Sequence, residues 1–570
     1  MDLRARLAWA AAMSLTPLLP LSARLVYLQV LQHQDLLTRV SDEVERTSRE
    51  APQRGDILDR GGRVLAQSVP AWSCYVDKPV VREPQLLARR LERELGIPAE
   101  HILQGLKGPG RFLRLTDDLA IEDADRVAEA RLQGVGIAAG YKRVYPNDGL
   151  GRGVIGTVSR DGRGLSGIEL AFDRELTRDP APREILRDGT GRRIYRAGVV
   201  DSARPAPLRL TLDRNYQFYA EEALAEAVGK YSAANGLVLV QDPADGELLA
   251  IAAYPPTALR NAAVQDAYEP GSTFKIVAAA AAVGESVVSA DETFFCENGS
   301  WELAPGVTIK DHEPAGHLNL AGIIEHSSNI GTAKVAERVG ALRFYRYCQA
   351  FGFLNRTGIG LPGETAGVFK PLSDMTRVSL LSASYGYGVA VSPLQLIGAY
   401  GAVANGGTLY EPSIVLSGRD PVRVRRVASQ ESVRKLTAFL EGVVERGTGV
   451  TAQIQGYRVA GKTGTARKLD PVTKRYSAVK FVASFVGFVP VSRPRFAILV
   501  LLDDPKGSAY YGSQVAAPVF AKLARGLLTL EGIPPDRPGA VEAVLRSPGA
   551  GALKEGARAP REAARLARAF

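Results

Sequence analysis

The feature of this sequence that most constrains its fold is a breaker pair followed by an uninterrupted apolar run. Pro270-Gly271 precedes Ser272-Thr273-Phe274-Lys275, and residues 276–283 then carry no polar side chain. Such a run is too apolar to lie outside a core, so the sequence predicts a helix that begins near Ser272 and enters the interior. On that helix Ser272 and Lys275 share one face, one turn apart.

This spacing suits a serine nucleophile with a lysine base. A serine hydroxyl is a weak nucleophile until a neighbour takes its proton, and a lysine can do so only when it is neutral. Burial or a nearby cation must therefore lower the lysine pKa from about 10.4. The same tetrad recurs at residues 432–435 and 477–480, but only the first copy follows a breaker pair and precedes an apolar helix.

Length and composition exclude several classes of protein. The chain has 570 residues, 46% of them hydrophobic, which is enough for several cores. Its net charge is +10, but acids and bases are interleaved and form no dense basic block, so nucleic acid is not an expected partner. The three cysteines are odd in number and widely separated, so they indicate no disulfide framework.

A metal site is also disfavoured, although two histidines lie close together. A zinc-binding His-Glu-x-x-His pattern needs its histidines four residues apart on a helix. His312 and His317 are five apart, with Pro314 and Gly316 between them. We expect neither a metal nor a cofactor.

The N-terminus has the pattern of a membrane anchor. Arg4 and Arg6 precede residues 7–23, which carry no charge. As a helix these residues would measure about 26 Å, just short of a hydrocarbon core of about 30 Å. A cleaved signal peptide is the alternative, but no clean small-x-small site ends the run and residues 25–31 continue apolar. We predict an uncleaved single-pass anchor in the cytoplasmic (inner) membrane, with the remainder of the chain outside it.

The rest of the chain mixes short strands and helices, which indicates an α+β fold. Residues 54–66 read as two strands around an Asp-Arg-Gly-Gly turn, and charged helices follow. A Pro-rich linker near residue 205 separates this elongated α/β pedestal from a second series of strands and helices. The predicted parts are residues 1–23 (cytoplasmic segment and anchor), 24–205 (stalk and pedestal), 206–530 (catalytic domain) and 531–570 (a basic tail expected to be disordered).

Two further motifs lie in the predicted catalytic domain. Ser327-Ser328-Asn329 lies between two helical segments, where its hydroxyl could relay a proton and its amide could hold a substrate amide. Lys462-Thr463-Gly464-Thr465 lies in an alternating segment that predicts a strand. Gly464 would allow a ligand backbone to approach that strand closely.

These three motifs, in this order, resemble the signature of β-lactamases and penicillin-binding proteins. The chain is similar to the class B penicillin-binding proteins from end to end. Beyond the anchor, the segments that carry the resemblance are residues 54–66, 164–169, 211–213, 269–275, 385–388, 392–395 and 511–520. The family implies a transpeptidase domain over 206–530, with an antiparallel sheet covered by helices on both faces and an all-helical subdomain.

The resemblance also implies what each motif residue does. Ser272 would be the acylated nucleophile and Lys275 would be its base. Ser327 would relay a proton, Asn329 would line the cleft and Lys462 would supply a positive charge. The hydroxyls of Thr463 and Thr465, on either side of Gly464, would bind the substrate carboxylate. The backbone N–H groups of Ser272 and Thr465 would form an oxyanion hole, in which one donor typically lowers the barrier by about 2.7–4 kcal/mol.

The implied reaction is attack on the D-Ala-D-Ala bond of a peptidoglycan stem peptide, followed by cross-linking to an amine of a neighbouring stem. β-Lactams would be inhibitors. Residues 482–490 and 503–507 resemble the cell-division type, which acts with a septal glycan polymerase and other division proteins. The elongation type is the alternative role. A β-lactam sensor or a non-catalytic scaffold is disfavoured because Ser272, Lys275 and Lys462 are intact.

A rival hypothesis from a different class is an NTPase. Residues 456–463 fit the P-loop pattern Gly-x₄-Gly-Lys-Thr, and residues 496–503 resemble an apolar strand that ends in a magnesium-binding Asp. A P-loop must follow a buried strand and open a helix, however. Residues 451–455 are a poor buried strand and residues 464–467 a poor helix start, so we reject this hypothesis.

Overall fold

The structure is a computed structural model that describes most of the chain. The described residues are 53–177, 205–256, 260–470, 473 and 475–537, with two short strands, β5 (Leu186–Arg187) and β6 (Arg193–Ile194), and a few single positions before residue 53. Of the predicted anchor only Pro20 and Ser22 are among them, and the predicted stalk lies outside them. Within these ranges, no helix has the length and apolar character needed to cross a membrane.

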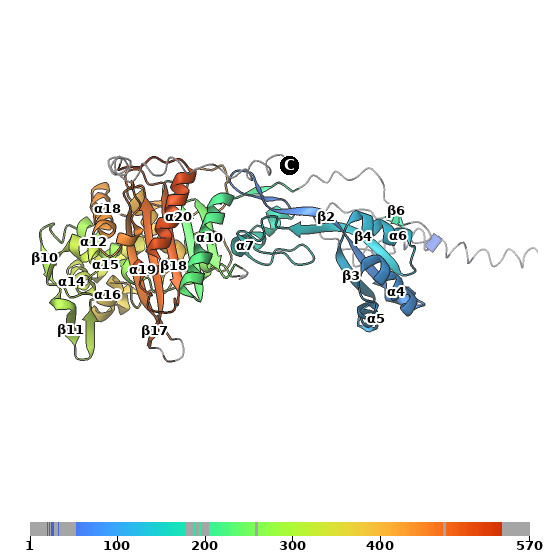
Figure 1. The fold of residues 1–570 in the computed structure, drawn as a ribbon, viewed down its shortest axis with the longest axis horizontal. Helices are drawn as coiled ribbons and strands as arrows, with labels where there is room; N and C mark the ends of the chain where they lie inside the picture. Colours follow the sequence, from blue (N-terminus) through green and yellow to red (C-terminus); the bar gives the residue numbers. More distant parts are fainter. Residues whose placement is uncertain are drawn as a thin grey trace, which may run out of the picture. The chain divides into compact units, whose positions relative to one another are not determined.

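The chain forms two compact units, which we describe separately (Figure 1). Among the described residues, unit 1 contains Val69–Lys142 and Arg160–Gly162, and unit 2 contains Arg54–Ser68, Arg143–Ser159 and the described residues from Arg163 onward. The units therefore alternate along the chain, whereas the sequence suggests one boundary near residue 205. The physical reason is a shared hydrophobic core. That core contains Leu210, which follows the expected boundary, and four residues that precede it, Ile57, Leu65, Val154 and Ile168.

Unit 1 is a small α+β layer. Strand β2 (Val64–Asp77), which enters this unit at Val69, pairs antiparallel with β3 (Phe112–Leu119), and β4 (Val135–Val144) also pairs with β2. Helices α4 (Pro84–Leu95), α5 (Ala99–Lys107) and α6 (Ile121–Glu129) supply most of the remaining core. The charged helices that the sequence predicts at residues 83–95 and 121–132 correspond to α4 and α6, and α6 ends three residues earlier than expected.

The first strands of unit 2 join its N-terminal segment to the segment that follows residue 205. Strand β1 (Ile57–Leu58) pairs antiparallel with the start of β2 and parallel with β7 (Leu208–Arg209). The predicted turn between β1 and β2 is present, and its buried Asp59 accepts hydrogen bonds from Arg63 and from the backbone N–H of Arg214. Arg214 begins α10 (Arg214–Tyr231), so this carboxylate holds the turn against the helix N-terminus.

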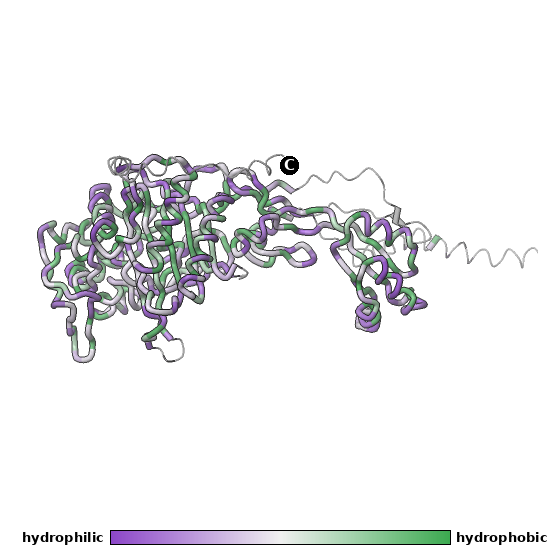
Figure 2. Tube along the Cα trace, in the orientation of Figure 1, coloured by the Kyte–Doolittle hydropathy of each residue, from purple (hydrophilic) through white to green (hydrophobic). Residues whose placement is uncertain are grey.

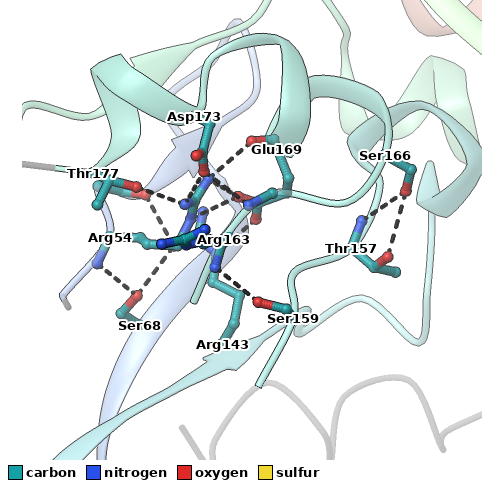
Figure 3. Close-up of polar contacts among 12 residues, drawn as sticks. Arg54, Ser68, Arg143, Thr157, Ser159, Arg163, Ser166, Glu169, Asp173 and Thr177 are labelled. Atoms are coloured by element: carbon teal, nitrogen blue, oxygen red, sulfur yellow. Dashed lines mark hydrogen bonds and ion pairs between the residues drawn. The ribbon is translucent and has the colours of Figure 1, made fainter. Parts of the chain in front are cut away.

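A buried ion network ties the two short N-terminal segments of unit 2 to the helices α8 (Gly167–Ala171) and α9 (Asp173–Leu176) (Figure 3). Glu169 accepts from Arg54 Nε at 3.0 Å and from Arg143 Nε at 2.7 Å. Arg54 also contacts Asp173 and Thr177. The side chains of Arg54, Arg143 and Glu169 are only 1%, 3% and 0% exposed, so each charge depends on its partners.

The main sheet of unit 2 is antiparallel throughout. Its strand order is β16 (Ala460–Leu469), β17 (Tyr476–Val489), β18 (Phe496–Asp503), β8 (Asn235–Gln241) and β9 (Leu248–Tyr254). Figure 2 shows that its central strands are hydrophobic, and their side chains are buried on both faces. Val238 and Val240 point into one hydrophobic core, and Leu237 and Leu239 point into the other.

Helices cover both faces of this sheet, as the sequence predicts (Figure 1). One face packs against α10, α19 (Gly512–Val515) and α20 (Ala517–Leu530). The other face packs against α17 (Pro393–Ala404) and α18 (Gln430–Glu445), and α12 (Lys275–Gly284) packs against α18 within the same core. The predicted helix behind Ser272 is therefore buried on this side of the sheet.

The expected all-helical subdomain is wrong in one respect, because its helices alternate with short antiparallel strand pairs. The helices are α11 (Ala262–Gln265), α13 (Leu320–Glu325), α14 (Asn329–Val339), α15 (Ala341–Ala350) and α16 (Arg377–Ser384); the strand pairs are β10 (Thr293–Phe295) with β13 (His317–Asn319), β11 (Ser300–Ala304) with β12 (Val307–Lys310), and β14 (Thr408–Tyr410) with β15 (Arg423–Arg426). Pro305-Gly306 closes the β11–β12 hairpin, with Gly306 at φ +79°.

The packed part of unit 2 continues beyond the expected boundary at residue 530. Ile533 packs against the core that contains α20, and the Asp536 carboxylate accepts from the backbone N–H groups of Arg458 and Ser492 at 2.6 and 3.2 Å. Residues 531–537 are therefore part of the domain. The rest of the predicted tail, residues 538–570, lies outside the described residues.

We predict that Glu169→Gln destabilises unit 2 by about 3–5 kcal/mol, because it removes the negative charge that two buried guanidinium groups share. Urea unfolding followed by circular dichroism measures this change. The control is Glu431→Gln, which breaks an exposed ion pair with Lys435 and should leave unfolding unchanged. A Glu169→Gln protein that unfolds like the wild type would contradict the prediction.

Candidate active site

Ser272 lies where the sequence places it, in a helical turn that leads into the core. It belongs to the 3₁₀-helix η3 (Gly271–Phe274), and Lys275 begins α12. The Ser272 Oγ and Lys275 Nζ atoms are 2.8 Å apart. Tyr400 on α17 fixes the turn, since its hydroxyl donates to the backbone oxygen of Thr273 at 2.9 Å.

The Lys275 amine is fully buried among oxygen atoms of the Ser327-Ser328-Asn329 motif. Nζ lies 2.7 Å from the Ser327 backbone oxygen, 2.7 Å from Asn329 Oδ1 and 3.1 Å from Ser327 Oγ. Ser327 has φ +61°, a left-handed conformation that costs a non-glycine residue about 1–3 kcal/mol. This conformation brings the backbone and side-chain oxygens of one residue to the same amine.

These contacts suit a neutral lysine. A neutral amine has two N–H groups and one lone pair. The Ser327 carbonyl and the Asn329 amide oxygen can only accept, so they take the two N–H groups, and the lone pair can then accept the Ser272 hydroxyl proton. Burial, and then the nearby Lys462, lower the pKa of Lys275 well below its usual value, while Asp311 opposes this shift.

Lys462 completes the polar centre from strand β16. Its Nζ is 3.0 Å from Ser327 Oγ, so this hydroxyl lies between the Lys275 and Lys462 amines. Burial lowers the pKa of Lys462 to about 7. A hydroxyl between two amines that are both easily deprotonated has the geometry that a proton relay requires.

Strand β16 approaches the serine turn more closely than any side chain would allow. A Cβ on Gly464 would lie 2.4 Å from Ser484 Oγ, 2.9 Å from Thr273 Cγ2 and 3.1 Å from the Pro270 oxygen. The sequence assigned this glycine to the approach of a ligand, but the structure shows that the protein itself fills that space. The next hydroxyl, Thr465 Oγ1, accepts from the backbone N–H of Gly512 at 3.0 Å.

The predicted site residues therefore form one cluster. Hydrogen bonds join Ser272, Lys275, Ser327, Asn329 and Lys462, and Thr463, Gly464 and Thr465 follow Lys462 along β16. The oxyanion hole formed by the N–H groups of Ser272 and Thr465 stays a prediction.

The two other Ser-x-x-Lys tetrads lack these surroundings. Lys435 pairs with Glu431 on the surface of α18, and Ser477 accepts from the backbone N–H groups of Val479 and Lys480 in the β17 hairpin. Neither serine has a buried amine beside its hydroxyl.

The backbone conformation of residues 460–469 contradicts the P-loop hypothesis. Residues 460–469 form a strand that pairs antiparallel with β17, and Lys462 lies within it rather than at a helix N-terminus. Asp503, the proposed magnesium ligand, pairs with Lys468 at 2.6 Å. In the described ranges, no group of three or more His, Cys, Asp or Glu side chains is placed to hold a metal ion.

Sequence reasoning missed Asp311, which lies at the end of β12. Its carboxylate accepts from the backbone N–H groups of Asn329 and Ile330 at 2.5 and 3.0 Å and from the Ser328 hydroxyl at 2.6 Å. The Asn329 amide also donates to the Lys310 oxygen at 2.8 Å. Asp311 thus fixes the residue that holds Lys275, although the sequence shows it only beside two histidines, with no local signal of this contact.

Comparison with known proteins agrees with this geometry. A model of the penicillin-binding protein transpeptidase domain matches residues 236–525, and a model of the penicillin-binding protein dimerisation domain matches residues 49–209. The chain belongs to the class B penicillin-binding proteins. The first model covers the main sheet, the serine turn and all three motifs.

Relatives within the family match over nearly the whole chain. The peptidoglycan D,D-transpeptidase FtsI of Escherichia coli is 32% identical, over 90% of each chain. Stage V sporulation protein D of Bacillus subtilis is 30% identical, over 93% of this chain and 86% of the relative. Penicillin-binding protein 3 of Mycobacterium tuberculosis has a similar fold, with a TM-score of 0.65 and 28% identity over 86% of this chain and 98% of that one; it has also been solved with aztreonam and with ampicillin.

We predict opposite shifts of the Lys275 pKa in two variants. Lys462→Met removes a neighbouring cation, so the pKa should rise; Asp311→Asn removes a neighbouring anion, so it should fall further. NMR titration of protein labelled with ¹³C-lysine measures both shifts, with the Lys275 signal assigned by its loss in Lys275→Ala. Lys435→Met, on the surface, should shift nothing. Shifts of the same sign in the first two variants would show that charge does not govern this amine.

Proposed function

We propose that this protein is a serine D,D-transpeptidase that cross-links peptidoglycan stem peptides through an acyl-enzyme on Ser272. The observation that carries this proposal is the 2.8 Å contact between Ser272 Oγ and a fully buried Lys275 amine, whose N–H groups have two acceptors. Membership of the class B family supports it, as does the name of the FtsI relative.

Acylation follows from the positions of the three motifs. Lys275 takes the Ser272 proton, and Oγ attacks the carbonyl carbon of the penultimate D-Ala. The N–H groups of Ser272 and Thr465 stabilise the oxyanion. When the C–N bond breaks, the departing amine of the last D-Ala receives the proton through the Ser327 hydroxyl, which lies between the two lysine amines. Thr463 and Thr465 hold the terminal carboxylate, beside the charge of Lys462.

The second half-reaction returns the enzyme to its starting state. An amine of a neighbouring stem peptide loses a proton to the same base and attacks the acyl carbon, which forms the cross-link and releases Ser272. A β-lactam would enter the first half only. Its strained amide opens on Ser272, but the ring nitrogen stays attached and cannot leave. The aztreonam and ampicillin complexes of the M. tuberculosis neighbour support this extension.

The proposed substrate lies outside the cytoplasm, so the proposal includes a location. Residues 7–23 would anchor the chain in the cytoplasmic membrane, with residues 24–205 as stalk and pedestal and the transpeptidase domain from 206 onward outside. The charge-free run after Arg4 and Arg6 supports this topology. A septal glycan polymerase and other division proteins would be the partners.

The division role is the finer part of the proposal. Residues 482–490 and 503–507 support it by their resemblance to the cell-division type. One relative is named for sporulation, and the elongation type is the alternative within the family. A β-lactam sensor or a non-catalytic scaffold is disfavoured, because Ser272, Lys275 and Lys462 are all intact and hydrogen bonds connect them through Ser327.

We predict that a fluorescent penicillin labels the wild-type protein and that Ser272→Ala and Lys275→Ala abolish the label, because the first removes the nucleophile and the second its base. Gel fluorescence measures the label, and mass spectrometry locates it. Ser477→Ala, which alters an exposed Ser-x-x-Lys tetrad, is the matched control and should label normally. Label that persists in Ser272→Ala would disprove the proposed nucleophile.

We predict that cells in which only Ser272→Ala is expressed continue to grow but do not complete septa, because the division type acts at the septum. Microscopy of depleted cells, with wild-type protein as the control, measures this outcome. Rods would become filaments. Rods that instead round up while still completing septa would move the protein to the elongation type.

A further inference from the structure

Thr448, in the loop after α18, contacts both walls of the proposed active site. Its Oγ1 lies 2.9 Å from Thr463 Oγ1 on the Lys-Thr-Gly strand. Its backbone N–H donates to the Glu325 oxygen at 3.1 Å, and Glu325 precedes Ser327 by two residues at the end of α13. One residue therefore joins the strand to the turn that carries the Ser-x-Asn motif.

The position of Thr448 is fixed by a close fit between α13 and the end of α18. The Glu325 carboxylate pairs with Arg446, whose Nε donates at 3.1 Å. A Cβ on Gly442 would lie 2.2 Å from Glu325 Oε1, and one on Gly447 would lie 2.4 Å from the Glu325 backbone oxygen. Because neither glycine has a side chain, Glu325 can lie this close to the end of α18. The loop that carries the Thr448 hydroxyl is therefore closely packed and has little freedom to move.

The contact between Thr448 and Thr463 determines whether the Thr463 hydroxyl can donate its proton to a ligand. A hydroxyl has one proton and two acceptor positions. Lys462 Nζ, 3.5 Å away, faces one acceptor position of Thr463 Oγ1, and a proton from Thr448 can fill the other. The Thr463 proton is then free to point at a substrate oxygen. A carboxylate can only accept, so it requires that proton.

We propose that Thr448 is a positioning residue that orients the Thr463 hydroxyl toward the terminal carboxylate of the substrate, and so contributes to selection of ligands that carry this carboxylate. Thr448 itself touches no reacting atom. The inference rests on the proposed function, because it assigns Thr463 to carboxylate binding. It differs from that proposal in predicting an effect that depends on the ligand's charge.

The test compares benzylpenicillin with its methyl ester, which keeps the strained amide and lacks the carboxylate. Thr448→Val keeps the shape and removes the hydroxyl. It should lower the second-order rate of acylation by benzylpenicillin about tenfold, the scale of one hydrogen bond to a charged group, and leave the rate with the ester unchanged. Thr448→Ser keeps the hydroxyl, so it should react with benzylpenicillin at the wild-type rate. Thr451→Val, three residues further on, removes a hydroxyl that bonds to Ser513 and should alter neither rate.

Each outcome decides between the alternatives. Equal losses with both compounds, or no loss with either, would overturn the orienting role, as would failure of Thr448→Ser to restore the rate. If Thr448→Val does not fold, as judged by thermal melting, Thr448→Ala takes its place in the same comparison. A folded wild-type protein that neither compound acylates would instead overturn the proposed function, so the two failures are distinguishable.

Discussion

The burial of one amine is the constraint on which the rest of this site depends. Lys275 occupies the first turn of a helix whose residues lie at the centre of the core, where a charged ammonium group is strongly disfavoured. The protein compensates with carbonyl and amide oxygens from Ser327 and Asn329 rather than with a carboxylate partner. A carboxylate would favour the ammonium form and remove the base. The polar partners are therefore neutral, and among the nearby charges Lys462, which favours the free amine, outweighs Asp311.

The surrounding framework holds these neutral partners from outside the cleft. Asp311 satisfies the N–H groups at the start of α14, and the same carboxylate opposes the effect of Lys462 on the lysine pKa. Gly464 lets the strand that carries Lys462 lie against the serine turn. The positions of the reacting groups thus depend on contacts within the protein as well as on contacts with the substrate, which is common where a mechanism needs preorganisation.

The N-terminal motifs have a different part in the molecule. Residues 54–66 and 164–169 carry the family resemblance but no chemistry, and the structure shows the physical role of both. Arg54 and Glu169 meet in a buried ion network, and Asp59 holds a turn against α10. Buried charges of this kind add little stability beyond what apolar residues would give, but they tolerate few alternative partners. They specify which segments pack together.

Sequence alone determined the features that depend on local spacing. The Pro-Gly break and apolar run placed Ser272 and Lys275 one turn apart at the start of a buried helix, and the order of three motifs identified the family. It could not determine contacts between residues far apart in the chain. Asp311, Glu325 and Thr448 lie in ordinary loop or helix-end sequence. Nothing local marks the contact of Asp311 with Asn329, or those of Thr448 with Glu325 and Thr463. The left-handed Ser327 and the lowered pKa of Lys275 were decided by packing, because only the folded chain removes water from the amine and brings its acceptors within 2.7 Å.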